Sequence, residues 1–169
     1  MVTNLVLIGY RGTGKSAVAR LLAERLGVEL ASLDEEIVKK AGRSIHEVVR
    51  IGGWDLFRAL ETEVVREAVA EDDRVLDTGG GVVTRPENVK MLRDWGTVVW
   101  LTASPVELAG RISESSDRPS LTGKKDFVEE IEEVLAEREP LYRAAAHHEV
   151  STSGRTAEEV ADEVISLIE

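Results

Sequence analysis

The chain has 169 residues, which suits one domain with a single hydrophobic core, and its 43% apolar and 31% charged residues are the usual balance of a globular protein. A formal net charge of −11 argues against a nucleic-acid-binding or membrane-surface protein, because both need a basic face, and the absence of cysteine excludes disulfides, thiolate metal sites and cysteine nucleophiles. The N-terminus has no basic signal region and no apolar run could span a bilayer, so we expect a cytoplasmic protein with no membrane or nucleic-acid partner. A monomer is the expected state.

Short apolar runs alternate with longer segments of helical periodicity along the whole chain. In chain order we expect a strand at 5–8, a helix at 17–26, a strand at 28–33, helices at 44–51 and 54–70, a strand at 74–77, a helix at 86–95, a strand at 97–101, a helix at 104–112, a polar loop at 113–125, a helix at 127–142, a strand at 148–150 and a helix at 156–168. This alternation predicts an α/β protein, with a parallel sheet covered by helices on both faces. Because no linker or repeat interrupts it, residues 1–169 are expected to form one domain.

A phosphate-binding motif follows the first expected strand directly. Residues 9–16, GYRGTGKS, fit the pattern G-x-x-x-x-G-K-[ST], in which glycines let backbone N–H groups converge on an anion at a helix N-terminus. Lys15 adds a charge for the β/γ-phosphates, and the Ser16 hydroxyl can bind Mg²⁺. The alternative, a glycine-rich turn with an accidental Gly-Lys-Ser, is weakened by the strand before the motif and the helix after it. The motif predicts a nucleotide site made by Arg11, Gly12, Thr13, Gly14, Lys15, Ser16 and Ala17.

A phosphate loop alone leaves two classes open, a small-molecule phosphotransferase and a GTPase-type switch. Guanine-selective switches usually carry an Asn-Lys-x-Asp signature, which this sequence lacks. Residues 113–125 are polar, aperiodic and include Arg118, and we interpret them as a mobile lid that a switch would not need. Because the whole chain is acidic, a local basic cluster must attract the nucleotide.

Four further segments occur in an ordered set. They are residues 53–61 (GWDLFRALE), the glycine triplet 79–81, Arg118-Pro119, and residues 138–142 (REPLY). Together with the phosphate loop and Asp34, this set resembles shikimate kinases from about Leu5 to Tyr142. The resemblance implies a P-loop three-layer α/β/α fold with a five-stranded parallel sheet and a lid. It also implies transfer of the γ-phosphoryl of ATP, with Mg²⁺, to the 3-hydroxyl of shikimate, a step on the chorismate route to aromatic amino acids.

The resemblance also assigns roles, position by position. The catalytic residues it implies are Lys15, Asp34 and Arg118; the shikimate-binding residues are Asp34, Arg58, Gly79, Gly80, Gly81 and Arg138; the further nucleotide-binding residues are Arg111, Arg118 and Arg155. Asp34 would hold the ring hydroxyls and act as base. Arg58 and Arg138 would bind the carboxylate, a role that suits the planar fork of a guanidinium, with Glu61 fixing Arg58. Such cations fit a reaction that depends on positioning and on neutralising phosphoryl charge.

Each of these residues also has a simpler interpretation. Arg58 and Glu61, three residues apart, are in most helices a solvent-exposed ion pair. Asp34 could only cap the helix that follows it, and the glycine triplet could be only a turn that ends a strand. The joint pattern, rather than any one residue, favours a site. The histidines at positions 46, 147 and 148 complete no metal-ligand spacing, and we assign them no chemistry.

Two segments depart from the family pattern. Family members usually have Asp-x-Asp at the end of the second strand, whereas residues 32–34 read Ser-Leu-Asp, and Asp77 ends the third strand where a small residue is more usual. The resemblance implies that the strand ending in Asp77 lies next to the first strand, so we predict that Asp77 organises Mg²⁺ together with Ser16. The alternative is that Asp77 only caps the glycine turn. In the lid, Ser120 replaces the usual apolar residue.

Two other functions remain open for this sequence. One is a kinase for another polyol acid, such as gluconate, which the glycine triplet and the two carboxylate-binding arginines disfavour. The other is a nucleotide-binding paralogue with weak turnover, which the intact phosphate loop, Asp34 and Arg118 disfavour.

Overall fold

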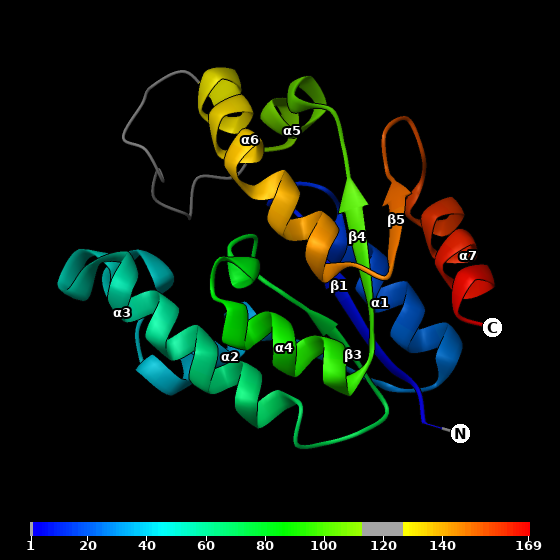
Figure 1. Cartoon of the computed structure of the whole chain (residues 1–169), viewed down its shortest axis with the longest axis horizontal. Helices are drawn as coiled ribbons and strands as arrows, with labels where there is room; N and C mark the ends of the chain where they lie inside the picture. Colours follow the sequence, from blue (N-terminus) through cyan, green and yellow to red (C-terminus); the bar gives the residue numbers. More distant parts are fainter. Residues whose placement is uncertain (1, 113–126) are drawn as a thin grey trace.

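One five-stranded parallel sheet organises the protein. A computed structural model describes residues 2–112 and 127–169 of the chain (Figure 1). The strands are β1 Asn4–Ile8, β2 Glu29–Ser32, β3 Arg74–Asp77, β4 Thr97–Thr102 and β5 His148–Ser151. Their order is β2-β3-β1-β4-β5, and every neighbouring pair is parallel, as the alternation of strands and helices predicted.

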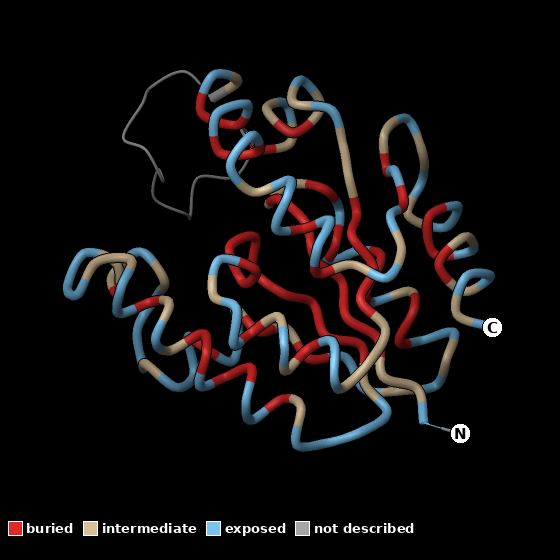
Figure 2. The backbone as a smooth tube through the Cα atoms, viewed as in Figure 1, coloured by how far each residue is buried: buried red, intermediate tan, exposed pale blue. Residues whose placement is uncertain are grey.

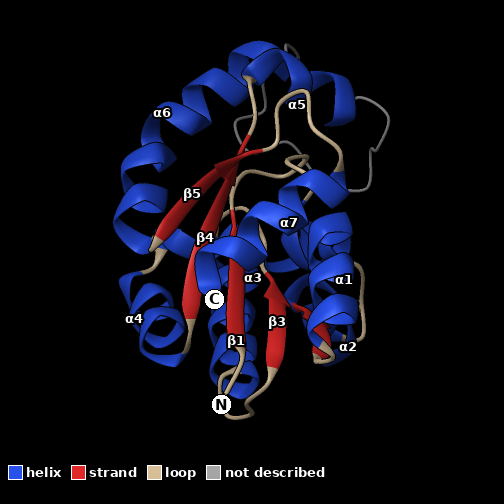
Figure 3. Cartoon of the chain, turned by 90° about the vertical axis from the view of Figure 1, so that its right-hand side faces the viewer, coloured by secondary structure: helices blue, strands red, loops and turns tan. Residues whose placement is uncertain are grey.

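Helices cover both faces of this sheet (Figure 3). They are α1 Lys15–Leu26, α2 Leu33–Ala41, α3 Ile45–Ala68, α4 Pro86–Trp95, α5 Pro105–Ile112, α6 Phe127–Ala145 and α7 Ala157–Ile168, with a short 3-10 helix, η1, at Val82–Thr84. Helices α1 and α7 pack on one face, and α3, α4 and α6 pack on the other. No helix within 2–112 or 127–169 is both long enough and apolar enough to cross a membrane.

The side chains of β1 explain why its sequence is a continuous apolar run. Leu5 and Leu7 belong to the core beneath α1 and α7, whereas Val6 and Ile8 belong to the core beneath α3, α4 and α6. A central parallel strand is buried on both faces, so both sets of alternating side chains are apolar. Figure 2 shows the central strands as the buried interior of the fold.

Several element boundaries differ from those expected, each for a local reason. Helix α1 begins at Lys15 rather than at residue 17, because Gly14 at its N-cap has the left-handed conformation (φ 94°) that starts the helix inside the motif. The break expected between the helices at 44–51 and 54–70 is confirmed: α3 consists of two helical stretches that meet at a kink, where Gly53 leaves helical geometry (φ 70°, ψ −177°). Strand β2 ends at Ser32 rather than at residue 33, because Ser32 is the N-cap of α2, and α6 continues to Ala145.

Candidate active site

A cavity of about 650 Å³ opens where the carboxyl ends of β1, β2 and β3 meet the N-terminus of α1. In open α/β sheets this is the usual place for a ligand. The residues that line it are Arg11, Gly12, Gly14, Lys15, Ser16, Ala17, Ser32, Asp34, Val38, Ser44, Ile45, Asp77, Thr78, Gly79, Gly80, Arg111 and Ile112. Three cations and two carboxylates thus face one space, which is the local basic cluster that an acidic nucleotide-binding chain requires.

The phosphate loop forms the floor of this cavity. It leads from β1 into α1, so the backbone N–H groups of the first helical turn face the cavity, where an anion is stabilised by the helix dipole. Lys15 is only 7% exposed as a residue, and its ammonium donates to the carbonyl oxygens of Gly9 at 2.7 Å and Tyr10 at 3.0 Å. These bonds hold its charge within the loop.

Ser16 and Asp77 meet at the edge of the same space. Strand β3 pairs directly with β1, as expected, and this pairing brings the end of β3 beside the phosphate loop. The Ser16 hydroxyl donates to Asp77 Oδ2 at 2.7 Å. Burial raises the pKa of Asp77, and the nearby Lys15 ammonium and the hydrogen bond from Ser16 oppose that rise.

Asp34 lies in the first turn of α2, half-buried on the cavity wall. The simpler interpretation of Asp34 as a helix cap is wrong, because the N-cap is Ser32, whose hydroxyl accepts from the Glu35 N–H. A Cβ atom placed on Gly79 would lie 3.0 Å from Asp34 Oδ1. Asp34 therefore faces the glycine turn with its carboxylate.

Arg58 and Glu61 form a buried ion pair on α3, rather than the solvent-exposed pair of the simpler interpretation. Arg58 Nη1 donates to Glu61 Oε1 at 2.8 Å, and their side chains are only 13% and 0% exposed. The rings of Trp54 and Phe57 flank the guanidinium at 5.4 Å and 5.0 Å. A Cβ atom on Gly81 would lie 2.1 Å from Arg58 Nη2, so only a glycine leaves room for this arginine.

Arg138 reaches the same glycine turn from α6. Its Nη1 atom lies 3.5 Å from the position a Cβ atom on Gly80 would take, and that position is also 3.3 Å from the backbone nitrogen of Arg11 in the phosphate loop. Tyr142, one turn further along α6, donates its hydroxyl to the Gly80 carbonyl at 2.5 Å. The turn 79–81 therefore lies so close to Asp34, both arginines and the phosphate loop that a single added carbon atom on its glycines would touch them.

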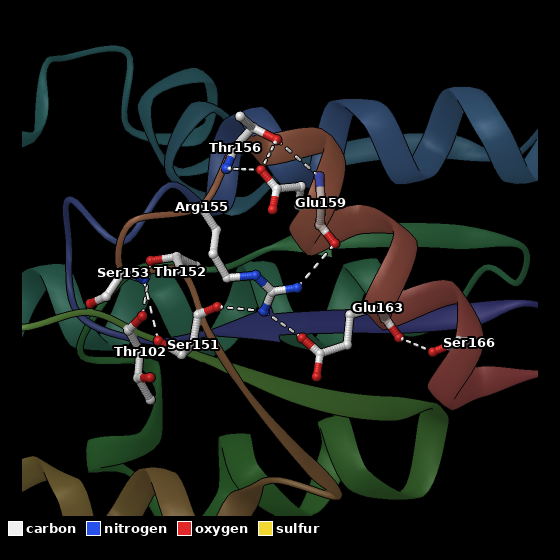
Figure 4. A network of polar contacts seen from close by, with 9 residues as sticks. All are labelled: Thr102, Ser151, Thr152, Ser153, Arg155, Thr156, Glu159, Glu163 and Ser166. Carbon is white, nitrogen blue, oxygen red and sulfur yellow. Dashed lines mark hydrogen bonds and ion pairs between the residues drawn. The ribbon is translucent and has the colours of Figure 1, made fainter.

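Of the two arginines expected beside adenine, the cavity contains one. Arg111 lines it, donating to the Gly12 carbonyl at 2.9 Å and to Glu107 at 3.2 Å. Arg155 is not among the lining residues and is bound to its own surroundings: it donates to the Ser151 carbonyl at 2.9 Å and to Glu163 at 2.5 Å (Figure 4). A contact between Arg155 and adenine stays a prediction.

The remaining expectations concern residues that the structure does not describe. Arg118, Ser120 and the whole of the lid at 113–125 lie outside the described residues. Within the described ranges, no group of three or more His, Cys, Asp or Glu side chains could hold a metal ion.

Sequence reasoning missed several wall residues. Thr78 lines the cavity and donates its hydroxyl to the Leu7 carbonyl at 2.7 Å, which ties the start of the glycine turn to β1. Its place between a strand end and the triplet could have indicated this role. Val38 and Ile45 line the cavity from α2 and α3, and no local pattern marks them.

Comparison with known proteins decides the family. The family model for shikimate kinase matches residues 11–169. The chain belongs to the shikimate kinase family. Among the similar relatives, the shikimate kinase of Geobacter metallireducens is 45% identical over 99% of this chain and 93% of its own length, and shikimate kinase 2 of Sodalis glossinidius is 40% identical over 99% and 94%.

Solved structures of shikimate kinases share the whole architecture. The shikimate kinase of Acinetobacter baumannii, solved in complex with shikimate, superposes with a TM-score of 0.95 at 34% identity, covering 99% of this chain and 93% of that one. The Aquifex aeolicus shikimate kinase gives 0.85 at 30% identity over 98% and 96%. The P-loop three-layer fold expected from the sequence is confirmed.

Proposed function

We propose that this protein transfers the γ-phosphoryl of ATP to the 3-hydroxyl of shikimate, giving ADP and shikimate 3-phosphate on the route to chorismate and the aromatic amino acids. The observation that carries the proposal is the turn 79–81, which lies close to two arginines suited to a carboxylate and also to the phosphate loop. An acceptor held there would lie next to the phosphates, which is what phosphoryl transfer requires. A cytoplasmic, monomeric enzyme without a membrane or nucleic-acid partner is part of the same proposal.

On the phosphate side, the loop N–H groups and Lys15 bind the β- and γ-phosphates, and Arg118 adds a further charge. Residues 9–17 form the nucleotide site, and Arg111 and Arg155 flank the adenine. The Lys15 contacts with loop carbonyls support this, because they keep a buried ammonium at the helix N-terminus. A site for transferring phosphoryl needs such fixed charges, since they stabilise developing charge without reorganising.

The residues present also fit Mg²⁺. Ser16 offers a hydroxyl and Asp77 a carboxylate on the cavity wall, and hard oxygen donors of this kind are what Mg²⁺ prefers. We infer that Ser16 binds the ion and that Asp77 accepts hydrogen bonds from its waters. The bound ion would neutralise charge on the phosphates.

On the acceptor side, Asp34 holds the ring hydroxyls and takes the proton of the attacking 3-hydroxyl. Arg58 and Arg138 bind the carboxylate. The backbone of Gly79 to Gly81 lies against these three side chains, which supports their acting on one bound molecule. Glu61 keeps Arg58 in place, because the buried pair orients the guanidinium before substrate arrives.

Acceptor selectivity tests this proposal. ADP formation in a coupled assay should depend on shikimate and should stay near the acceptor-free rate with gluconate, because a flexible open-chain acid does not present its carboxylate and hydroxyl at a fixed separation. Faster turnover with gluconate would support the alternative kinase. Nucleotide binding without turnover on either acid would support a weakly active paralogue.

A further inference from the structure

Tyr142 forms a buried hydrogen bond to the glycine turn, and the proposed mechanism gives this residue no role. Its side chain is completely buried, and its hydroxyl donates to the Gly80 carbonyl at 2.5 Å. This bond joins α6 to the middle residue of the turn 79–81, across 62 positions of sequence. Because both groups are buried, a lost donor would leave the carbonyl without this partner, which costs more than the bond itself contributes.

Gly80 lies at the junction between the two halves of the site. A Cβ atom there would be 3.3 Å from the Arg11 backbone nitrogen and 3.5 Å from Arg138 Nη1, so the residue separates the phosphate loop from a carboxylate-binding arginine. Small shifts of Gly80 would change the distance between these two parts. Phosphoryl transfer is sensitive to displacements of that kind.

The Tyr142 ring is itself fixed to the sheet. It stacks on Trp100 of β4 with ring centroids 5.6 Å apart and an interplanar angle of 28°. Burial raises the pKa of Tyr142 to about 12, so the hydroxyl keeps its proton, and hence its role as donor, at ordinary pH. The tyrosine therefore anchors the turn to β4 through a stacked ring and a permanent donor.

Helix α6 lacks one of its own backbone hydrogen bonds close to Arg138. Pro140 lies inside the helix, between Arg138 and Tyr142, and has no N–H to donate to the carbonyl of Ala136. The helix is thus weakened at the turn that carries Arg138. Tyr142 is the next residue toward the C-terminus that faces the sheet and is fully buried.

We propose that Tyr142 is a positioning residue for the acceptor: it fixes the Gly80 carbonyl to α6 and so sets the distance between Arg138 and the phosphate loop. This inference rests on the proposed function. It assigns Tyr142 no contact with either substrate.

The test compares Tyr142→Phe, which keeps the stacked ring and removes the hydroxyl, with the wild-type chain. The KM for shikimate should rise about tenfold, the scale of one lost buried hydrogen bond, while the KM for ATP stays within about twofold. Replacing Tyr142 by p-aminophenylalanine restores a weaker donor, so its KM for shikimate should lie between the two. If Tyr142→Phe is too unstable to assay, the p-aminophenylalanine variant still tests the inference, because its KM for shikimate should rise in the same direction by a smaller factor.

Trp95→Phe is the matched control. Trp95 Nε1 donates to the Glu71 carbonyl at 3.0 Å near the amino ends of the strands, so this variant also exchanges an aromatic donor for phenylalanine, but away from the cavity. It should leave both KM values unchanged. An unchanged KM for shikimate in Tyr142→Phe, or equal increases for both substrates, would overturn the inference.

Hydrogen exchange separates this inference from the proposed function. The amides of Val82 and Thr84 are bonded to Gly79 and Gly81, and they should exchange faster in Tyr142→Phe but not in Trp95→Phe. If these two amides exchange at the wild-type rate in Tyr142→Phe, Tyr142 does not anchor the turn, and this conclusion holds whichever acceptor the enzyme phosphorylates. If Tyr142→Phe shows the faster exchange but the wild-type chain does not phosphorylate shikimate, the anchor stands and the proposed function is contradicted.

Discussion

The Ser16 hydroxyl donates a 2.7 Å hydrogen bond to the Asp77 carboxylate and so joins the first turn of α1 to the carboxyl end of β3. Asp77 pairs in register with Ser32 on β2. Ser32 is where the family pattern leads us to expect a carboxylate, and its hydroxyl caps α2 instead. The carboxylate that is bonded to Ser16 of the phosphate loop therefore belongs to β3, the strand next to β2.

If Asp77 organises Mg²⁺, Asp77→Asn should raise the Mg²⁺ concentration for half-maximal rate about tenfold or more and lower turnover. Thermal stability of the apo protein should change little, because asparagine still accepts from Ser16. Adding Ser32→Asp to this variant returns a carboxylate to the paired position and keeps a good helix cap, so Mg²⁺ dependence should partly recover. A loss of stability with unchanged Mg²⁺ dependence would make Asp77 a structural cap.

Loss of either carboxylate-binding arginine should weaken use of shikimate. Arg58→Ala and Arg138→Ala should each raise the activation free energy derived from kcat/KM for shikimate by about 2–5 kcal/mol, since a buried charge-assisted contact is lost. Steady-state kinetics measure this, with Arg66→Ala as control, because Arg66 is exposed on the same helix. Shikimate kinetics near wild type in both variants would refute the assignment.

The close approach of Gly81 to Arg58 leads to a third prediction. A methyl group in Gly81→Ala would overlap the guanidinium, which Glu61 prevents from moving freely, so the KM for shikimate should rise about 10- to 100-fold. The KM for ATP should be unchanged. Gly110→Ala is the control, since no described atom lies within 4 Å of the added carbon. A KM for shikimate near the wild-type value in Gly81→Ala would contradict this prediction, because it would show that the Arg58 guanidinium can move without weakening shikimate binding.

A histidine outside the cavity should make stability depend on pH. His147 Nδ1 accepts from the Val98 N–H at 2.9 Å, and although the residue is largely exposed, slight desolvation and the nearby Arg93 charge lower the pKa of His147. Because the folded pKa lies below the unfolded value of about 6.5, the unfolded chain binds more protons as pH falls, and stability present above pH ~6.5 is lost below it.

Thermal unfolding between pH 7.5 and 5.5 checks this effect. The drop in Tm on acidification should be smaller in His147→Asn than in the wild type. His46 lies on α3 rather than beside Val98, so His46→Gln is the control and should keep the full drop. Equal drops in wild type and His147→Asn would show that another group titrates.

Much of the fold could be predicted because its strands carry local signals. The run at 5–8 is apolar on both faces of a central strand, and the phosphate loop fixes which end of the sheet carries the site. The break inside α3 could also be predicted, because the helical pattern stops before the glycines at 52 and 53, and a glycine adopts the positive φ of Gly53 without a steric penalty.

Residues of the candidate site could be predicted where the residue type itself indicates a chemical role. They could not be predicted where only a tertiary contact brings the residue to the site. The pair of Arg58 and Glu61 has the spacing of an ordinary surface pair, and only its burial distinguishes it. The role of Tyr142 depends on a contact with a residue 62 positions away, which no local pattern contains. Arg155 fits a motif position, yet its bonds to Ser151 and Glu163 arise from the packing of α7 (Figure 4).

The most direct test of the central claim is the identity of the product. The chain would be incubated with ATP, Mg²⁺ and shikimate, and the product examined by phosphorus–proton correlation NMR. We predict one new phosphate ester, coupled to the proton on carbon 3 of shikimate, formed in equal amount with ADP. Release of inorganic phosphate alone, or an ester at another hydroxyl, would contradict the account.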